Sequence, residues 1–98
     1  MADAKDNNVF NNFELYQNYP NPFNPTTTVR FFMKEEGNVK LEVYNMLGEK
    51  LLDLLDERMS EGNHEVLVDA GNLASGVYIY RLNVNNTFAI AKTMTLLK

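Results

Sequence analysis

The sequence predicts an all-β domain, an immunoglobulin-like antiparallel β-sandwich of about seven strands. Three observations support this fold class. Segments in which apolar and polar residues alternate recur about every 8 to 12 residues, the spacing of short strands. Glycine, asparagine, serine and proline separate these segments, as in chains where strands follow one another without intervening helices. The chain has 98 residues, which suits a single hydrophobic core.

The composition predicts a core that stabilises the domain without cross-links. The chain contains 45% hydrophobic residues, 11% aromatic residues and no cysteine, so disulfides and thiolate metal sites do not contribute. Residues 1–12 are polar and rich in asparagine, which predicts a flexible leader or linker remnant. We expect the folded domain to cover residues 13–98 and to be one piece of a larger protein.

The segment from residue 13 to residue 25 is predicted to be extended. Pro20, Pro22 and Pro25 exclude a helix and disfavour a central strand, because proline lacks the backbone N–H that both structures use. Four aromatic side chains are too many for an exposed loop, so we expect the segment to lie across the domain and close one edge or end of the core. These aromatic residues are Phe13, Tyr16, Tyr19 and Phe23.

Alternation predicts the remaining strands. We expect them over residues 26–34, 39–44, 64–69, 77–84 and 88–97. A break at residues 45–48 predicts a tight hairpin with Gly48 at positive φ, and Asn85 and Asn86 predict a second turn. Residues 49–58 are ambiguous, because their leucines also fit a helical stripe. The turn before them and the strands on both sides favour a strand over residues 50–55.

Tyr78 is predicted to have a structural role. It begins the penultimate strand, at the position where β-sandwiches often tie a tyrosine hydroxyl to an upstream backbone group in a tyrosine corner. Arg81 shares the opposite face of this strand with Val77 and Ile79. That mixture predicts a face that is only partly buried.

Little in the sequence indicates chemistry, and we predict no enzyme activity, no cofactor and no metal site. The net charge of −4 argues against binding to nucleic acid or to an anionic membrane. No apolar run approaches the roughly 20 residues of a transmembrane helix. His64 is the one histidine, so a two-histidine metal site or a histidine relay cannot form, and we expect a solvated side chain. The oxygens around Asp69 match no calcium loop.

Sugar binding is the main alternative that the residues leave open. The chain has no tryptophan, so a stacking platform would have to use tyrosines. The alternative function is therefore an immunoglobulin-like spacer, or a carbohydrate or cell-attachment module of a secreted glycoside hydrolase or adhesin. The tyrosines in question are Tyr16, Tyr19, Tyr44 and Tyr80.

Five sequence blocks in a fixed order resemble the type A C-terminal sorting domain of type IX secretion, also called the Por secretion system. The resemblance covers roughly residues 13–98. The blocks are YPNPFNPTTTVRF (19–31), VKLEVYNMLG (39–48), GNHEV (62–66), LASGVYIYRL (73–82) and KTMTLLK (92–98).

This resemblance implies that the domain functions as a sorting signal for export. Family members from Bacteroidetes are the C-terminal domains of exported proteins, and the larger cargo precedes them in the same chain. The cargo passes through the periplasm, the outer-membrane type IX machinery recognises the domain, and a sortase-like protease often removes it. The cargo then remains on the cell surface or is secreted.

The resemblance also implies which residues carry the sorting information. It assigns most of that information to residues 77–98, and Gly76, Tyr78, Lys92 and Lys98 match the pattern. Many members have two adjacent basic residues where this chain has Lys92 and then Thr93. If the last strand lies at a sheet edge, residues 88–97 are expected to be available for pairing with a receptor strand.

Overall fold

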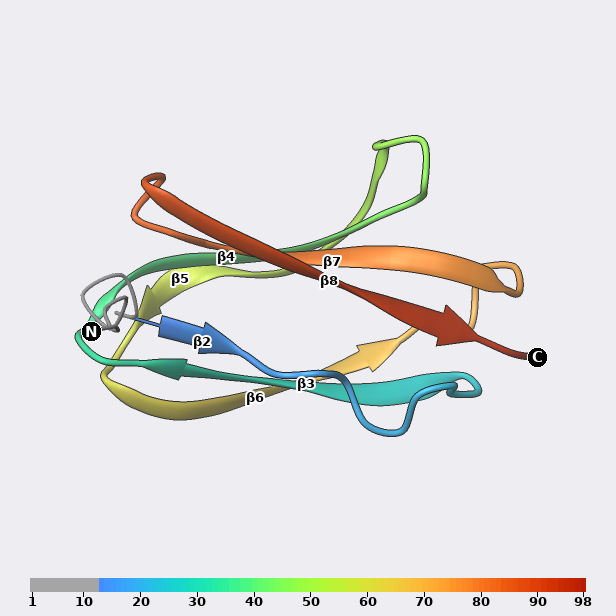
Figure 1. Cartoon of the computed structure of the whole chain (residues 1–98), viewed down its shortest axis with the longest axis horizontal. Helices are drawn as coiled ribbons and strands as arrows, with labels where there is room; N and C mark the ends of the chain where they lie inside the picture. Colours follow the sequence, from blue (N-terminus) through green and yellow to red (C-terminus); the bar gives the residue numbers. More distant parts are fainter. Residues whose placement is uncertain (1–12) are drawn as a thin grey trace, which may run out of the picture.

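The computed structural model describes residues 13–98, which form seven strands in two facing antiparallel sheets (Figure 1). One sheet has the strand order β2-β3-β6, and the other has the order β5-β4-β7-β8. The predicted all-β sandwich is therefore confirmed. The predicted leader, residues 1–12, lies outside the described residues. The strands are β2 (Phe13–Leu15), β3 (Thr26–Met33), β4 (Gly37–Tyr44), β5 (Lys50–Met59), β6 (Gly62–Asp69), β7 (Gly76–Val84) and β8 (Phe88–Leu96).

The core lies between the two sheets, and the alternation of each strand builds it. β7 shows the pattern most clearly, because every second side chain is buried. The buried ones are Tyr78, Tyr80, Leu82 and Val84. β3 in the opposite sheet alternates in the same way, so its apolar side chains join those of β4 and β7 in one cluster. Ile79 and Arg81 are half-buried on the outer face, as predicted.

β5 is a strand, as predicted, and it extends to Met59. Its pairing with β4 shifts register between Leu41 and Glu42, so that Leu54 is an extra residue in the ladder. Such a bulge lets two consecutive residues turn toward the same side. Leu54 and Leu55 both pack against the core, which explains why the leucine spacing imitates a helix.

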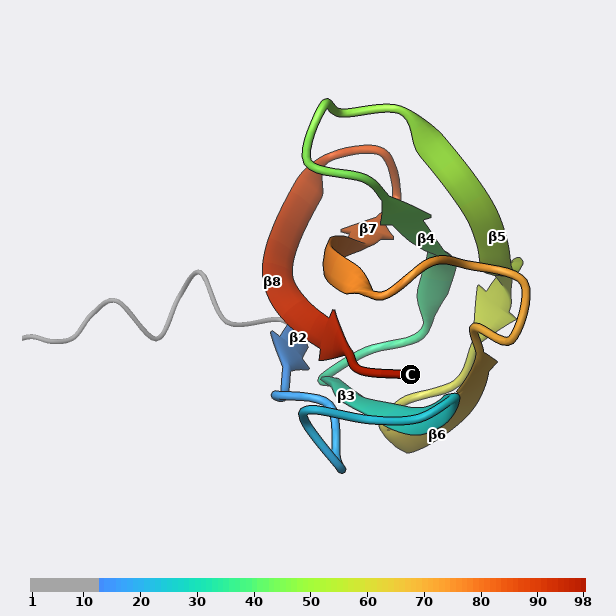
Figure 2. The same ribbon diagram turned by 90° about the vertical axis from the view of Figure 1, so that its right-hand side faces the viewer.

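Some turns in this fold close a hairpin within one sheet, and one connects the two sheets. Their residue types do not distinguish the two kinds. Gly48, at φ 88°, closes a true hairpin between β4 and β5, and Asn85 and Asn86, at φ 56° and 55°, close the β7–β8 hairpin. The turn after β3 instead carries the chain to the other sheet, and β3 pairs with β2 and β6. Figure 2 shows the result, with β8 beside β2 at one side of the sandwich and β5 beside β6 at the other.

The proline-rich segment closes one edge of the sandwich, as predicted, but only part of it enters the core. Phe13 and Phe23 are buried, whereas Tyr16 is 37% exposed and Tyr19 is 75% exposed. The expectation that all four aromatic side chains pack inside is therefore wrong for these two tyrosines. Tyr19 exchanges backbone hydrogen bonds with Thr28, at 3.0 Å each. This pairing places Tyr19 along the outer edge of β3, away from the core.

Candidate recognition surface

The β7–β8 hairpin and the chain end after it contain all the residues that the sequence assigns to recognition. β7 is the only strand of residues 13–98 that pairs with β8, which is therefore the edge strand of its sheet, and Phe23 adds an isolated parallel bridge at Leu96. The register places Gly76 opposite Leu96 and Lys92 opposite Tyr80. Gly76, Tyr78 and Lys98 thus gather at one end of the sandwich, whereas Lys92 lies near the middle of the hairpin.

Lys98 is held against the loop between β6 and β7. Its backbone N–H donates to the Ser75 hydroxyl at 2.9 Å, and its ammonium donates to the Gly71 carbonyl at 2.6 Å. Both contacts are exposed to solvent. They fix the position of the last residue relative to the strand that begins at Gly76.

Tyr78 makes the contact that the sequence predicts for a tyrosine corner. Its side chain is buried, and its hydroxyl donates a hydrogen bond to the carbonyl of Ala74, four residues upstream. The bond connects the β6–β7 loop to the beginning of β7. Lys98 and Tyr78 therefore both depend on the conformation of this loop.

Lys92 differs from these residues in its surroundings. It is half-buried and lies opposite the buried Tyr80 in the ladder. Among the described residues, the ion pairs involve Lys50 and Arg58 but not Lys92. Its ammonium is thus a cation without a carboxylate partner in this part of the chain.

The outer edge of β8 is covered over its C-terminal half by the proline-rich segment. The Gln17 amide donates to the Thr93 carbonyl at 2.8 Å, and the Asn21 side-chain oxygen accepts from the Thr95 N–H at 2.9 Å. Phe23 completes the cover, because its N–H donates to Thr95 and its carbonyl accepts from Leu97, both at 3.0 Å.

These bonds narrow the edge that a receptor strand can reach. Backbone groups of every second residue in an edge strand point away from the neighbouring strand. Thr93 and Thr95 use theirs to bind the proline-rich segment. The same alternation turns the N–H and C=O groups of Ala89 and Ala91 outward, where no other residue of the described range 13–98 hydrogen-bonds them. The expectation that all of residues 88–97 is available is therefore wrong for the C-terminal half of β8. The first half makes none of these hydrogen bonds within residues 13–98, and it lies beside β2, with the rings of Phe13 and Phe88 5.9 Å apart.

Tyr80 is a core residue and not part of a binding surface. Its hydroxyl accepts from the Asn18 N–H at 2.9 Å and donates to the Tyr16 carbonyl at 2.8 Å. The Asn18 side chain in turn donates to the Thr27 hydroxyl at 3.0 Å. Burial raises the pKa of Tyr80, and the bond from Asn18 offsets part of the rise. No local sequence pattern predicts this network, because Asn18 and Tyr80 lie 62 positions apart in the chain.

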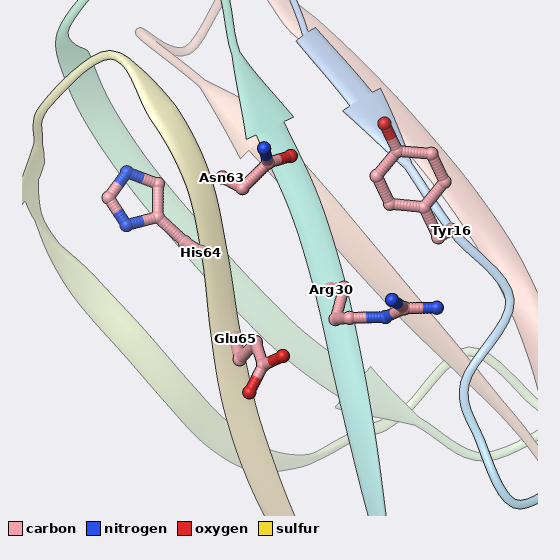
Figure 3. Close-up of a pocket in the computed structure, with 5 residues that line it drawn as sticks. All are labelled: Tyr16, Arg30, Asn63, His64 and Glu65. Atoms are coloured by element: carbon pink, nitrogen blue, oxygen red, sulfur yellow. The ribbon is translucent and has the colours of Figure 1, made fainter.

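A shallow depression of about 550 Å³ lies over the outer face of β3 and β6 (Figure 3). Arg30 and Glu65 are cross-strand neighbours in the ladder, and the Arg30 side chain extends away from Glu65 in Figure 3. The Arg30 guanidinium carbon lies 6.0 Å from the centre of the Tyr16 ring. The His64 ring points away from Arg30 and Tyr16. It packs on Phe31, with ring centres 5.3 Å apart.

His64 is therefore half-buried, and the predicted solvated side chain is confirmed only in part, because the hydrogen-bonded ring nitrogen lies in an exposed site. One ring nitrogen lies 2.7 Å from the Ser60 carbonyl, which accounts for its orientation. Within residues 13–98, no three histidine or carboxylate side chains gather closely enough to hold a metal ion. The described part of the chain also has no helix with the length and hydrophobicity of a membrane span.

Comparisons with known proteins extend this description. Residues 17–96 match the family model of a secretion system C-terminal sorting domain. Among solved structures, the crystal structure of dimeric latent PorU from Porphyromonas gingivalis is similar, with a TM-score of 0.72 and 25% sequence identity. The similarity covers 87% of this chain and 9% of the PorU chain. A search of curated proteins gives no match.

Proposed function

The chain belongs to the C-terminal sorting domain family of type IX secretion, and from this membership we propose that it directs a larger cargo across the outer membrane. The cargo precedes the domain in the same chain. It passes through the periplasm, is recognised by the outer-membrane type IX machinery, and ends on the cell surface or in the medium. A sortase-like protease acts on the domain after export.

The observation that carries this proposal is the way the fold displays its last strand. β8 is an edge strand, and the proline-rich segment and Lys98 hold its C-terminal half in place. A signal that is read by another protein needs a fixed shape, because disorder in the free state would lower the affinity. The proline-rich segment and the contacts of Lys98 with the β6–β7 loop give residues 93–98 such a shape.

Recognition is proposed to use the β7–β8 hairpin at two places. Gly76, Tyr78 and Lys98 form one, at the end of the sandwich, and Lys92 forms the other. The outward backbone groups of Ala89 and Ala91 lie beside Lys92, on the half of β8 to which the proline-rich segment makes no hydrogen bond. A receptor strand that pairs there would also meet the ammonium of Lys92.

A secretion assay tests this function. Residues 1–98 are fused behind a signal peptide and a fluorescent cargo in a Bacteroidetes host with type IX secretion. We expect fluorescence at the surface or in the medium, and retention in the periplasm in a host that lacks the type IX machinery. Cargo that stays in the periplasm of the competent host would refute the proposal.

A pair of charge reversals tests the recognition residues. Deleting residues 91–98 would remove Met94 and Leu96 from the core, so substitution is the sharper approach. Lys92→Glu is expected to reduce secretion, whereas Lys40→Glu, on the exposed face of β4, is expected to leave it unchanged. Equal secretion of the two variants would show that Lys92 does not contribute to recognition.

Sugar binding is the second candidate function, and one observation favours it. The exposed Tyr16 and Tyr19 both lie beside Arg30, and Glu65 lines the hollow next to each of them. Aromatic rings with nearby charged and polar groups suit a saccharide. Tyr80 is excluded from this role by its burial. Isothermal titration with xylan, cellulose and lipopolysaccharide tests the idea, and binding that Tyr19→Ala does not weaken would contradict it.

A further inference from the structure

The tip of the β4–β5 hairpin exposes two large apolar side chains. Met46 is 61% exposed and Leu47 is 85% exposed, and Figure 1 shows this green loop projecting beyond the other strands of its sheet. Single exposed apolar residues are ordinary on protein surfaces. Two adjacent ones at the end of a projecting hairpin are a small continuous patch, which we call the apolar tip.

The turn does not need these two side chains. The Asn45 side-chain oxygen accepts from the backbone N–H groups of Leu47 and Glu49, both at 2.9 Å. Gly48 supplies the positive φ of 88° and donates to the Asn45 carbonyl at 3.0 Å. The conformation therefore depends on Asn45 and Gly48, and polar residues would fit at positions 46 and 47 equally well.

The same hydrogen bonds make the apolar tip rigid. The Asn45 amide also donates to the Glu49 carboxylate at 2.6 Å, and the Asn45 N–H donates to the Glu49 carbonyl at 3.0 Å. A rigid loop loses little conformational entropy when it binds a partner. The apolar tip is thus held ready for insertion into a complementary pocket.

Acidic groups next to the apolar tip indicate the chemistry of that partner. Glu49 lies in the turn, and Lys50 binds Asp53 at 3.0 Å and Glu42 at 3.4 Å. Three carboxylates thus accompany one ammonium. Anionic lipid headgroups and the phosphates of lipopolysaccharide would be repelled. A protein pocket with an apolar floor and a basic rim is complementary in both shape and charge.

The position of the apolar tip connects it with the residues proposed for recognition. Tyr44, the last residue of β4, pairs with Ile79, three positions after Gly76. The apolar tip therefore lies at the same end of the sandwich as Gly76, Tyr78 and Lys98, and Figure 1 shows the projecting loop and the C-terminus at that end. One partner surface can span both.

We propose that the apolar tip is a second docking element of this sorting domain, which inserts Leu47 and Met46 into an apolar, basic-rimmed pocket of a protein in the export machinery. This inference rests on the proposed function. Burial of a leucine side chain contributes enough binding energy to change affinity by about tenfold or more. The contact adds to, and is separate from, the pairing at β8.

The full chain, fused to the fluorescent cargo described above, tests the inference with three variants. Leu47→Asp removes the apolar contact, Leu47→Met keeps it, and Leu67→Asp is the matched control. Leu67 is 68% exposed on β6 in the other sheet, so the same substitution is made at a similar exposure but a different place. We expect secretion to fall about tenfold for Leu47→Asp and to stay at the wild-type level for the other two.

Each remaining outcome counts against the inference. Equal secretion of Leu47→Asp and Leu67→Asp, whether high or low, would overturn it. A wild-type fusion that stays in the periplasm would refute the proposed function and, with it, this inference. A secreted wild-type fusion with equal secretion of the two Asp variants would refute the inference alone. Thermal unfolding of the purified variants checks folding, and if Leu47→Asp unfolds, Met46→Gln is judged by the same comparison. If the domain floated with phosphatidylglycerol or lipopolysaccharide vesicles and this flotation depended on Leu47, the partner of the apolar tip would be a membrane and not a protein pocket.

Discussion

Removal of the Tyr80 hydroxyl by Tyr80→Phe is expected to destabilise the domain by about 2 to 4 kcal/mol. The hydroxyl makes two hydrogen bonds, at 2.9 Å with the Asn18 N–H and at 2.8 Å with the Tyr16 carbonyl. Each bond contributes about 1 kcal/mol, and a buried donor left without a partner costs roughly 1 to 3 kcal/mol. Asn18 is only 2% exposed, so water cannot easily replace the lost acceptor. Phenylalanine otherwise fills the same space.

Equilibrium unfolding in urea, followed by far-UV circular dichroism, measures this loss. In thermal unfolding, each kcal/mol of lost stability lowers the Tm of a domain of this size by about 4 to 8 °C. The Tm of the Tyr80→Phe variant is therefore expected to fall by roughly 10 to 30 °C. Tyr44→Phe is the matched control, because its hydroxyl donates to the Glu42 carboxylate at 2.8 Å in a partly exposed site, where a loss below about 1 kcal/mol is expected. A loss for Tyr80→Phe no larger than that of the control would refute the buried-network argument.

Three further predictions use the same unfolding assay. Tyr78→Phe is expected to cost about 1 to 3 kcal/mol, because its hydroxyl bonds the Ala74 carbonyl from a buried ring, and an unchanged stability would show that the corner is not structural. Gly48→Ala is expected to cost about 1 to 2 kcal/mol, because φ is 88° and a Cβ is strained there, whereas Gly48→Asn should cost less. Burial raises the pKa of Tyr80 above 10.0, so the unfolded state ionises first and stability should fall as the pH rises past about 10. That part of the pH dependence should disappear in Tyr80→Phe, and its persistence there would assign it to other groups.

The strands and their buried faces could be predicted from the sequence because both depend on local periodicity. In β7, side chains alternate between the two faces of the sheet, so the inward position of Tyr78 and the outward position of Arg81 followed from their spacing. Gly48 and Asn85 were also identifiable, because a positive φ is a local requirement that few residues meet. The hydrogen bond of Tyr78 spans only four residues and belongs to the same class.

The candidate surface depended on contacts that no local pattern records. The proline-rich segment was expected to close an edge, but only the fold shows that Gln17, Asn21 and Phe23 bind the C-terminal half of β8 and not its first half. Likewise, the four aromatic residues of that segment look equivalent in sequence, yet the pairing of Tyr19 with Thr28 turns it outward.

The sequence by itself determined which residues form strands, which side of each strand is apolar and where the chain must turn. The tertiary structure decided which strands pair, that Leu54 is an extra residue in the ladder, and that Asn18 and Tyr80 bond across 62 positions. The physical reason is that backbone conformation and side-chain alternation act between near neighbours in the chain. Pairing and polar burial depend instead on the global packing that brings distant segments together.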